Sequence, residues 1–406
     1  MFYRPLKYPT YRLIWLATLF SNIGTWIHTV AASLLMTKLS SSAAIIALVQ
    51  TAAMVPLFIF SIPGGVAADR YNRKRLIIFA HTFMASVAVI MAALSYQGMM
   101  TDNLLLGCIF LLNIGLAFNQ PAWQTVSSLL VPPTEIKQAA ALNNLSYNLS
   151  RCIGPAIAGY FFTTLGPSYL FLLNAISFLG VIAVFSFYVN SNNLAPTQTP
   201  SVSFYAGLKQ VASCFREMPE FKAILIKSFC YFSLSATLFA TLPFIVIIHY
   251  GMSNHDLGLL MTAAGLGAIT CAFSICHLRN KLHDKQMTTL SFMIASFVII
   301  SISKATAIYF LAPLMMLFGF SWALAVSVFN GSLQADFPPH IRSRMIGVYT
   351  VFFACAQALG SYMGGILVQK TGLAHEQACI AAALAIIALY YAFSPFYFFR
   401  RQPHAH

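Results

Sequence analysis

The sequence predicts an all-α integral membrane protein with twelve transmembrane helices, arranged as two six-helix halves. Three observations lead to this prediction: an apolar composition, twelve long apolar runs and an internal repeat. Of the 406 residues, 59% are hydrophobic and only 8% are charged, whereas roughly a quarter of the residues in a soluble domain are charged. A chain with so few charges cannot cover a dissolved globule, so we expect the lipid bilayer to be its solvent.

A helix needs about 20 mainly apolar residues to cross a bilayer. Twelve runs reach about this length, and none shows the period-two alternation of a barrel strand, so we expect helices. The predicted spans are 12–36, 44–67, 76–96, 103–129, 138–163, 168–189, 222–249, 256–277, 287–304, 307–331, 344–368 and 374–398.

The basic residues predict how the spans are oriented. With twelve spans and both termini on one side, 19 of the 23 Lys and Arg residues fall on that side and 3 on the other, with Arg151 inside a span. Because basic loops stay in the cytoplasm, we expect both termini to be cytoplasmic. This topology also explains the net charge of +14 without a nucleic-acid partner.

One long polar stretch divides the chain. Residues 190–203 are rich in Asn, Ser, Thr and Pro, and Phe204, Leu208, Val211 and Phe215 follow at helical spacing. This pattern indicates a linker with an amphipathic helix on the cytoplasmic surface. We therefore predict an N-terminal half at 1–190, a linker at 191–221 and a C-terminal half at 222–406.

The two halves share a weak repeat. The segment from Val131 to Lys137 recurs from Phe337 to Ser343, an offset of 206 residues. At the same offset Gly154 corresponds to Gly360, and Gly159 to Gly365. Parallel repeats of this kind place a substrate site between the halves, near the middle of the membrane.

The most specific stretch runs between the second and third spans. Its sequence combines small residues, one acid and a basic cluster, and its candidate residues are Gly64, Gly65, Asp69, Arg70, Arg73, Lys74 and Arg75. A tight polar hinge between two spans has this pattern, and its bases place it in the cytoplasm. A solvated basic loop that only sets topology is the alternative interpretation.

This stretch resembles the loop 2–3 signature of the major facilitator superfamily. Further stretches resemble one branch of it, the transmembrane secretion effectors, which include enterobactin exporters and macrolide or drug:proton antiporters. The matching stretches are Ser21–Trp26, Asn119–Ala122, Ala141–Asn143, Asn148–Pro155 and Leu172–Phe178. The resemblance is dense in the first half and thin in the second. It implies the major facilitator fold, alternating access, and a gate-latch role for Asp69 through contact with span eleven.

The fifth span contains Gly154, Pro155 and Gly159, which resemble the antiporter motif of exporters, although Tyr160 replaces the second of the usual paired glycines. Proline removes a helix hydrogen bond, and small residues let a neighbouring helix approach closely. The resemblance favours an exporter over an importer. An ordinary kinked packing helix remains the alternative.

Arg151 is the only formally charged side chain near the centre of a span. Because a charge there costs roughly 2.5–3.5 kcal/mol on insertion scales, we expect it to face protein or a water-filled cavity. It could bind an anionic or carbonyl-rich substrate, modulate a proton site, or bond backbone carbonyls as a structural residue.

Polar stripes on several spans predict a cavity lining, with helix–helix adhesion as the alternative. The first span has Thr18, Asn22, Thr25, Trp26, Thr29 and Ser33 on one broad face, and Gln357 occupies the repeat position of Arg151. The candidate lining residues are Asn22, Trp26, Asn113, Gln120, Gln124, Asn144, Asn148 and Gln357.

The carrier of a coupling proton is less evident. The nine Asp and Glu residues all fall at span ends or in loops, so proton antiport is implied by the resemblance alone. His28 lies within the first span but off its polar stripe, where a packed neutral imidazole is the favoured interpretation. Asp69 is the best carboxylate candidate.

We therefore expect a secondary exporter of an amphiphilic small molecule, a siderophore or drug-like compound, in a bacterial inner membrane. A non-transporting sensor and an importer of the same fold are the alternatives. An enzyme is not expected, because no nucleophile, His and acid cluster at one depth, and no phosphate loop indicates an ATP-driven pump. The scattered cysteines and the terminal His404 and His406 predict no metal site. No cofactor beyond a proton gradient is expected, and the protein should be a monomer.

Overall fold

The computed structural model describes residues 3–189, 218–305, 307–335 and 339–393. Within these ranges twelve helices have between 19 and 33 residues, and no strand is present. The helices are α1 (Pro9–Leu39), α2 (Ala43–Arg70), α3 (Arg73–Tyr96), α4 (Asp102–Leu129), α5 (Ile136–Thr164), α6 (Gly166–Tyr188), α8 (Pro219–Pro243), α9 (Asn254–Lys281), α10 (Asp284–Ile302), α11 (Ile308–Ala335), α12 (Pro339–Thr371) and α13 (Leu373–Phe393).

Each predicted span coincides with one of these helices. Eleven are long and apolar enough to cross a membrane, and α5 is the exception because Asn143, Asn144, Asn148 and Arg151 make it more polar. Short helical turns occur at Arg4–Lys7 and Pro133–Glu135, and a π-helical segment at Phe244–His249 continues α8. The predicted linker helix at 204–215 and the tail with His404 and His406 lie outside the described residues.

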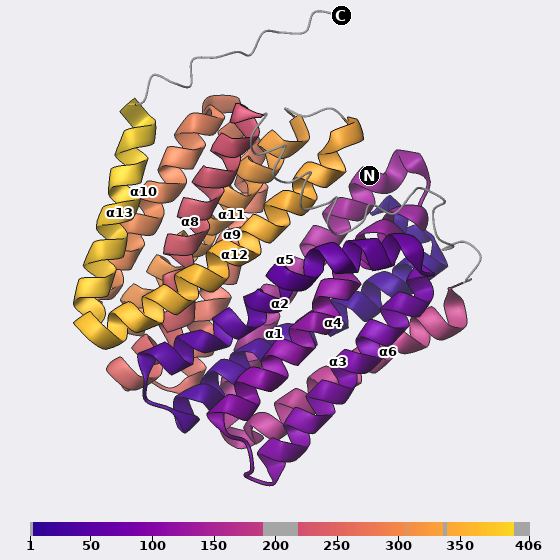
Figure 1. Ribbon diagram of the computed structural model, residues 1–406, viewed down its shortest axis with the longest axis horizontal. Helices are drawn as coiled ribbons and strands as arrows, with labels where there is room; N and C mark the ends of the chain where they lie inside the picture. Colours follow the sequence, from indigo (N-terminus) through magenta and orange to yellow (C-terminus); the bar gives the residue numbers. More distant parts are fainter. Residues whose placement is uncertain (1–2, 190–217, 306, 336–338, 394–406) are drawn as a thin grey trace, which may run out of the picture.

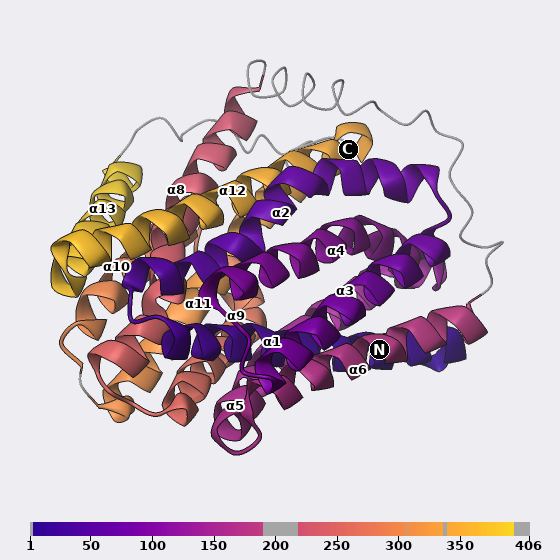
Figure 2. The same ribbon diagram turned by 60° about the horizontal axis from the view of Figure 1, so that its bottom comes forward.

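The helices form two groups, α1–α6 and α8–α13 (Figure 1). In the first group α1 packs on α5 and α6, α2 on α4, and α3 on α4 and α6. In the second group α8 packs on α12, α9 on α11, and α10 on α11 and α13. The groups meet where α2 packs on α12 and α5 packs on α9. Both views show α2 and α12 side by side (Figures 1 and 2).

Short connections make consecutive helices antiparallel, so the bundle has two distinct ends. We call the end with the α2–α3 turn at Tyr71 and Asn72 the basic end, because Arg70, Arg73 and Lys74 surround that turn. We call the end with the α1–α2 connection at residues 40–42 the opposite end.

Hydrogen bonds at the helix ends fix the basic residues around the α2–α3 turn. The Asn72 side chain accepts hydrogen bonds from the backbone N–H groups of Lys74 and Arg75, which starts α3. Lys74 Nζ donates to the carbonyls of Ser186 and Val189, 3.0 and 2.8 Å away. A lysine there satisfies the carbonyls at the end of α6 and complements its dipole. The hinge between the second and third helices is therefore two residues long and tied to α6.

The glycines of the repeat occupy equivalent places in the two groups. A Cβ on Gly154 would collide with Trp26 Cβ of α1, and one on Gly360 would collide with the Ser233 carbonyl of α8. Each of these two glycines thus packs on the first helix of its own group. Gly159 instead packs on Gly258 of α9, and Gly365 on Ala47 of α2, so both contact the other group. The 206-residue offset read from the sequence therefore corresponds to a shared packing pattern.

Candidate functional site: a cavity between the helix groups

A cavity of about 790 Å³ lies between the two helix groups. Helices α1, α2, α3, α4, α5 and α6 of the first group and α8, α9, α11 and α12 of the second contribute to its wall. Ile136, the first residue of α5 at the basic end, is part of the lining, and Ser33 and Ile46 mark its extent toward the opposite end. This volume falls within the range of sites that hold drug-sized ligands.

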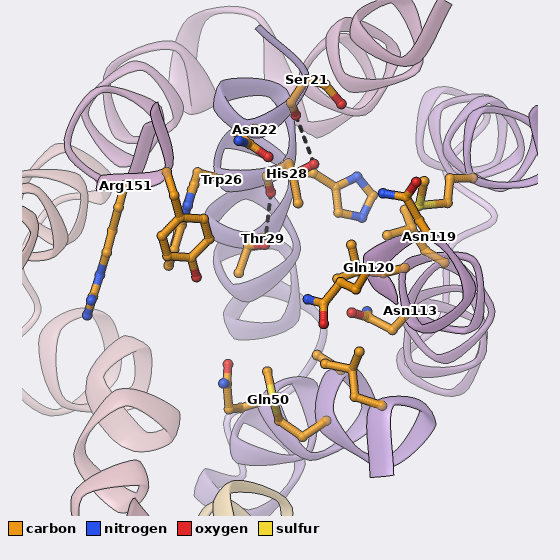
Figure 3. Close-up of a pocket in the computed structure, with 18 of the residues that line it drawn as sticks. Ser21, Asn22, Trp26, His28, Thr29, Gln50, Asn113, Asn119, Gln120 and Arg151 are labelled. Atoms are coloured by element: carbon orange, nitrogen blue, oxygen red, sulfur yellow. Dashed lines mark hydrogen bonds between the residues drawn. The ribbon is translucent and has the colours of Figure 1, made fainter. Parts of the chain in front are cut away.

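The predicted polar stripe of α1 lies along the cavity wall. All six of its members, Thr18, Asn22, Thr25, Trp26, Thr29 and Ser33, contribute to the lining. Three hydroxyls donate to carbonyls four residues earlier in α1: Thr25 to Ser21, Thr29 to Thr25 and Ser33 to Thr29, at 2.9 to 3.0 Å. Two of these bonds, at Ser21 and Thr29, are drawn as dashed lines in Figure 3. Because these hydroxyls spend their hydrogens within the helix, Asn22 and the Trp26 indole are the side chains of this face best suited to contact a ligand.

Seven of the eight predicted cavity residues line the cavity: Asn22, Trp26, Asn113, Gln120, Gln124, Asn144 and Gln357. Asn148 departs from the prediction, because its Nδ2 donates to the Asn144 carbonyl of its own helix and it is not part of the lining. The α5 residues that do line the cavity are Ile136, Ala139, Ala140, Asn143, Asn144, Tyr147 and Arg151.

Amides gather on the wall formed by the first group. Asn113, Asn119 and Gln120 of α4 lie across the cavity from Arg151, with Gln50 of α2 on the wall between them (Figure 3). Asn113 Nδ2 donates to the Ile109 carbonyl at 2.8 Å, whereas the buried Oδ1 of Asn119 has no partner. The sequence analysis did not select Gln50 or Asn143 for the lining, although each stands out as an amide in a membrane helix.

Arg151 is the only lining residue of the cavity with a permanent charge. Its side chain is buried, and its guanidinium carbon lies 5.7 Å from the centroid of the Trp26 ring and 5.3 Å from that of Phe239. These are cation–π distances. In the described part of the chain, no carboxylate adjoins the guanidinium, so its positive charge is not neutralised by an ion pair. This arrangement favours a role for Arg151 in binding a ligand over a structural role in which its guanidinium donates to backbone carbonyls.

The second group contributes an aromatic wall. Phe239, Trp322 and Phe353 all line the cavity. The Phe239 and Trp322 ring centroids are 5.2 Å apart, and those of Trp322 and Phe353 are 6.3 Å apart. Sequence analysis missed this wall, because aromatic residues on apolar helices are indistinguishable from ordinary core residues until the helices are packed.

Two histidines lie at the wall of the first group. His28 is 4% exposed, packs on the Phe171 ring at 4.8 Å, and neither of its ring nitrogens has a hydrogen-bond partner. His81 is also buried, with Nδ1 2.9 Å from the Ile77 carbonyl and its ring 5.7 Å from that of Phe178. Each packs on one phenylalanine ring of α6 and is buried, which fits the packed, neutral interpretation of His28.

The two groups are joined at the opposite end. Ser42 Oγ of α2 donates to Gln369 Oε1 of α12 at 2.6 Å, and the Ala44 N–H donates to the same oxygen at 3.3 Å. Across the other interface, Asn254 Nδ2 of α9 donates to Thr163 Oγ1 of α5 at 3.2 Å. The cavity is therefore closed toward this end and reaches toward the basic end.

Two glycines set the closest approach between the groups. A Cβ on Gly159 would lie 2.8 Å from the Gly258 Cα, and a Cβ on Gly258 would lie 2.6 Å from the Pro155 carbonyl. Nearer the cavity, Thr262 Oγ1 donates to the Cys152 carbonyl at 2.9 Å. Tyr160, which stands where the antiporter motif has its second glycine, is 61% exposed and packs at the edge of this contact on the His255 ring of α9, with the ring centroids 6.2 Å apart. On the α9 side of the contact, Gly258 has no side chain, and this leaves room for α5 to approach closely.

The signature stretch lies at the basic end, away from the closed interface. Gly64 lets α2 approach α4, since its Cβ would lie 2.5 Å from the Ala117 carbonyl, whereas Gly65 faces open space. Asp69 and Arg70 are exposed in the last turn of α2, and Arg73 is buried at the start of α3. The predicted contact between Asp69 and span eleven involves the first turns of α12, whose side chains lie outside the described residues.

Within the described residues, no group of three or more His, Cys, Asp or Glu side chains could hold a metal ion. The cavity has no carboxylate or cysteine in its lining. What this wall offers a ligand is one cation, several amides and an aromatic surface. Such a set binds and orients a molecule, with acceptor oxygens directed at Arg151 and apolar rings against Trp26, Phe239 and Trp322.

The family model of the transmembrane secretion effectors matches residues 2–400. The chain belongs to this family. Its members are transporters of the major facilitator superfamily, and curated relatives within it are efflux proteins. The resemblance seen in the signature stretch and in the fifth span is thereby confirmed at the level of the family.

Three relatives illustrate the range of this transmembrane secretion effector family. Macrolide efflux protein A of Streptococcus pyogenes is 19% identical over 384 residues, with 91% of this chain and 93% of the relative covered. The multidrug efflux pump Tap of Mycolicibacterium fortuitum is 23% identical over 400 residues, covering 94% and 95%. The enterobactin exporter EntS of Citrobacter koseri is 24% identical over 376 residues, covering 90% and 87%.

Solved structures show the same fold at lower identity. A POT family transporter in complex with a thioalcohol-conjugated peptide aligns with a TM-score of 0.79 at 13% identity, covering 95% of this chain and 96% of the other. The nucleoside transporter NupG, as a D323A mutant, aligns with a TM-score of 0.77 at 12% identity, covering 94% and 99%. This effector-family chain therefore has a transporter fold of the major facilitator type.

Proposed function

We propose that this protein is a secondary active exporter of an amphiphilic small molecule, powered by proton antiport. The single observation that carries the proposal is the cavity of about 790 Å³ with Arg151 held between Trp26 and Phe239. A cation over aromatic rings, faced by amides, suits a compound with both ring surface and acceptor oxygens. The named activities of the three relatives, which are efflux of macrolides, of several drugs and of enterobactin, support export over import.

We propose further that the twelve helices are twelve spans in two halves, 1–190 and 222–406, in a bacterial inner membrane. In this assignment the basic end is cytoplasmic, together with both termini, following the positive-inside rule. The shared glycine packing of α5 and α12 supports the division into halves. The described conformation is then inward-open, since the cavity reaches toward the basic end and the opposite end is closed. We expect a monomer to be sufficient for transport.

The decisive experiment measures compound accumulation in cells that lack their own efflux pumps and express this protein. The panel contains a catecholate siderophore, a macrolide and the cationic dye ethidium, each with and without a protonophore. Lower accumulation that the protonophore abolishes supports proton-driven export and identifies the substrate class. Equal accumulation for every compound, with the protein present in the membrane, contradicts the proposal for these classes.

A membrane sensor with the same fold is the second candidate, and Asp69 separates the two. In an exporter, Asp69→Asn should abolish efflux but leave ligand binding unchanged, because Asp69 lies in the signature stretch far from the cavity lining. In a sensor the same substitution should change little. Asp102→Asn, which alters a half-buried acid in the first turn of α4 at the opposite end, is the matched control.

A further inference from the structure

Glu376 is a buried carboxyl that the sequence analysis grouped with the acids at span ends. It lies in the first turn of α13 at the opposite end, and only 1% of its surface is exposed. Among the described residues, its Oε1 has no hydrogen-bond partner, and neither do Oε1 and Nε2 of Gln377, which is also 1% exposed. A buried carboxylate without a cation is costly, and such a group takes up a proton instead.

The surroundings of Glu376 supply no compensating charge. On the helices packed around α13, the basic side chains near this end are His249, Lys304, Lys370 and His375, and all four are exposed. Lys227 of α8 and Asp284 and Lys285 of α10 belong to the basic end of those helices. Among the described residues, Thr237 of α8 supplies the polar side chain that adjoins the Glu376 carboxyl.

Thr237 connects Glu376 to the backbone of α8. Thr237 Oγ1 donates its single hydrogen to the Leu234 carbonyl, 2.8 Å away in α8. While this hydrogen is on the Leu234 carbonyl, the hydroxyl offers no donor to Glu376, and this arrangement suits a neutral carboxyl better than a carboxylate. Loss of that proton would turn the hydroxyl toward the carboxylate and release the Leu234 carbonyl. The protonation state of Glu376 is therefore linked to a backbone contact in α8.

The same site adjoins the closed interface between the halves. A Cβ on Gly364 of α12 would lie 2.8 Å from Thr237 Cβ, so α12 packs directly on the residue that faces Glu376. The next residue, Gly365, packs on Ala47 and Ala44 of α2. One turn later, Gln369 accepts from Ser42 and Ala44. A change at Thr237 thus reaches the α2–α12 contact within two turns of one helix.

A second cavity lies next to Glu376 in the chain. A cavity of about 420 Å³ at the opposite end is lined by Phe244, His249, Ser303, Val368, Gly372, Leu373, Ala374 and His375. Its last three lining residues immediately precede Glu376 in α13. On the inner side, α8 contacts both Glu376 and the main cavity, because Thr237 adjoins Glu376 while Phe239, Ala240 and Pro243 line that cavity.

We propose that Glu376 is a proton-binding site whose protonation holds α12 against α2 and so keeps the opposite end closed. The proposal rests on proton antiport as the proposed function and names the residue that carries the proton. Since the closed state buries the carboxyl, it binds the proton more tightly than a state that exposes Glu376 to water, and by linkage a low pH favours closure. Ionisation at higher pH favours opening of this end.

The test measures closure directly and needs no substrate. Spin labels are attached at Ser41→Cys and Thr371→Cys in the full chain, with the eight native cysteines replaced, and inter-label distances are recorded in proteoliposomes from about pH 5 to about pH 8. We expect the closed population of the otherwise unaltered protein to fall as the pH rises. Glu376→Gln, a neutral isostere, should stay closed throughout and lose the pH response, whereas Glu220→Gln, at an exposed acid of α8, should retain it.

Two further results complete the design. Thr237→Val should shift the midpoint of the pH response without abolishing it, which a purely structural Glu376 would not produce. If Glu376→Gln does not fold, Glu376→Asp takes its place and should also shift the midpoint. An unchanged response in the folded Glu376 variants, or the absence of any response before substitution, overturns the proposal. Protonophore-insensitive efflux with an intact, Glu376-dependent response would contradict proton antiport alone.

Discussion

The guanidinium carbon of Arg151 on α5 lies 5.3 Å from the ring centroid of Phe239 on α8, so the charge at the cavity wall is shared between the two helix groups. Trp26 of α1 lies on its other side, at 5.7 Å. At the repeat position of α12, Gln357 also lines the cavity. The equivalent position thus carries a cation in the first half and an amide in the second. Because only one side of the cavity is positively charged at this position, a ligand with acceptor oxygens has a preferred orientation.

Replacing Arg151 should change selectivity more than folding. We expect Arg151→Gln to reduce binding of carboxylate or catecholate compounds about tenfold or more, because a charge-assisted hydrogen bond contributes about 1.5–3 kcal/mol. Ethidium, itself a cation, should bind as well or better. Tryptophan fluorescence titration of the purified protein measures both affinities.

The control for this prediction is Asn148→Ala, one turn away on α5 but outside the cavity lining. It should leave both affinities unchanged. A variant at Arg151 that loses all compounds equally, or none, would contradict a selective role for the guanidinium.

The close contact of α5 and α9 predicts a conformational phenotype for Gly258. In Gly258→Val, the new side chain would collide with the Pro155 carbonyl and the Gly159 Cα, at 2.6 and 2.9 Å from the added Cβ. Because backbone atoms cannot move aside cheaply, we expect the closed state to be lost. A disulfide between cysteines placed at Thr163 and Asn254, whose side chains now share a hydrogen bond, should form much less.

Gly180→Val is the matched control for Gly258→Val, because a Cβ at that position of α6 meets nothing within 4 Å. It should cross-link and transport normally. Equal cross-linking in both valine variants would show that the glycine contact does not determine closure.

The elements of this fold were accessible from the sequence because the bilayer imposes a strict length and polarity on each span. All twelve predicted spans coincide with helices. The α5 span was recognisable because its other residues are mainly apolar, although it contains Arg151 and three asparagines. The polar stripe of α1 was predicted completely, since a helix face in lipid can be polar only where it meets protein or water. The glycine offset between Gly154 and Gly360 likewise carried real packing information.

The features that sequence analysis missed depend on partners from distant segments. Phe239 and Trp322 became cavity residues only when α8 and α11 faced the first group. Glu376 was classed with span-end acids, although α8 and α12 cover it there. Asn148 was assigned to the cavity because it lies one turn after Asn144. The face of α5 that borders the cavity carries Tyr147 and Arg151 instead. Spacing along one helix cannot specify which face the neighbouring helices leave open.

Gln369 offers a test of how the opposite end is held closed. Its Oε1 accepts from both Ser42 Oγ and the Ala44 N–H, which joins the end of α12 to the first turn of α2. We expect Gln369→Ala to lower the closed population several-fold, because two partly exposed hydrogen bonds contribute on the order of 1 kcal/mol. Spin-label distances across this end at a fixed pH measure the change. Gln97→Ala, an exposed amide at the same end after α3, should have no effect, and a closed population unchanged by Gln369→Ala would assign closure to the glycine contacts alone.

Lys74 predicts a separate, structural effect of the signature stretch. Its Nζ donates to the Ser186 and Val189 carbonyls at the end of α6, so Lys74→Met should leave these groups without their charged donor. We expect a destabilisation of about 1–2 kcal/mol, discounted for partial exposure, which thermal unfolding in detergent would detect as a lower Tm. Arg75→Met, at the exposed neighbouring position, removes the same charge without that contact and should leave Tm unchanged. Equal Tm values for the two variants would mean that Lys74 serves only as one of the topology-setting charges at the basic end.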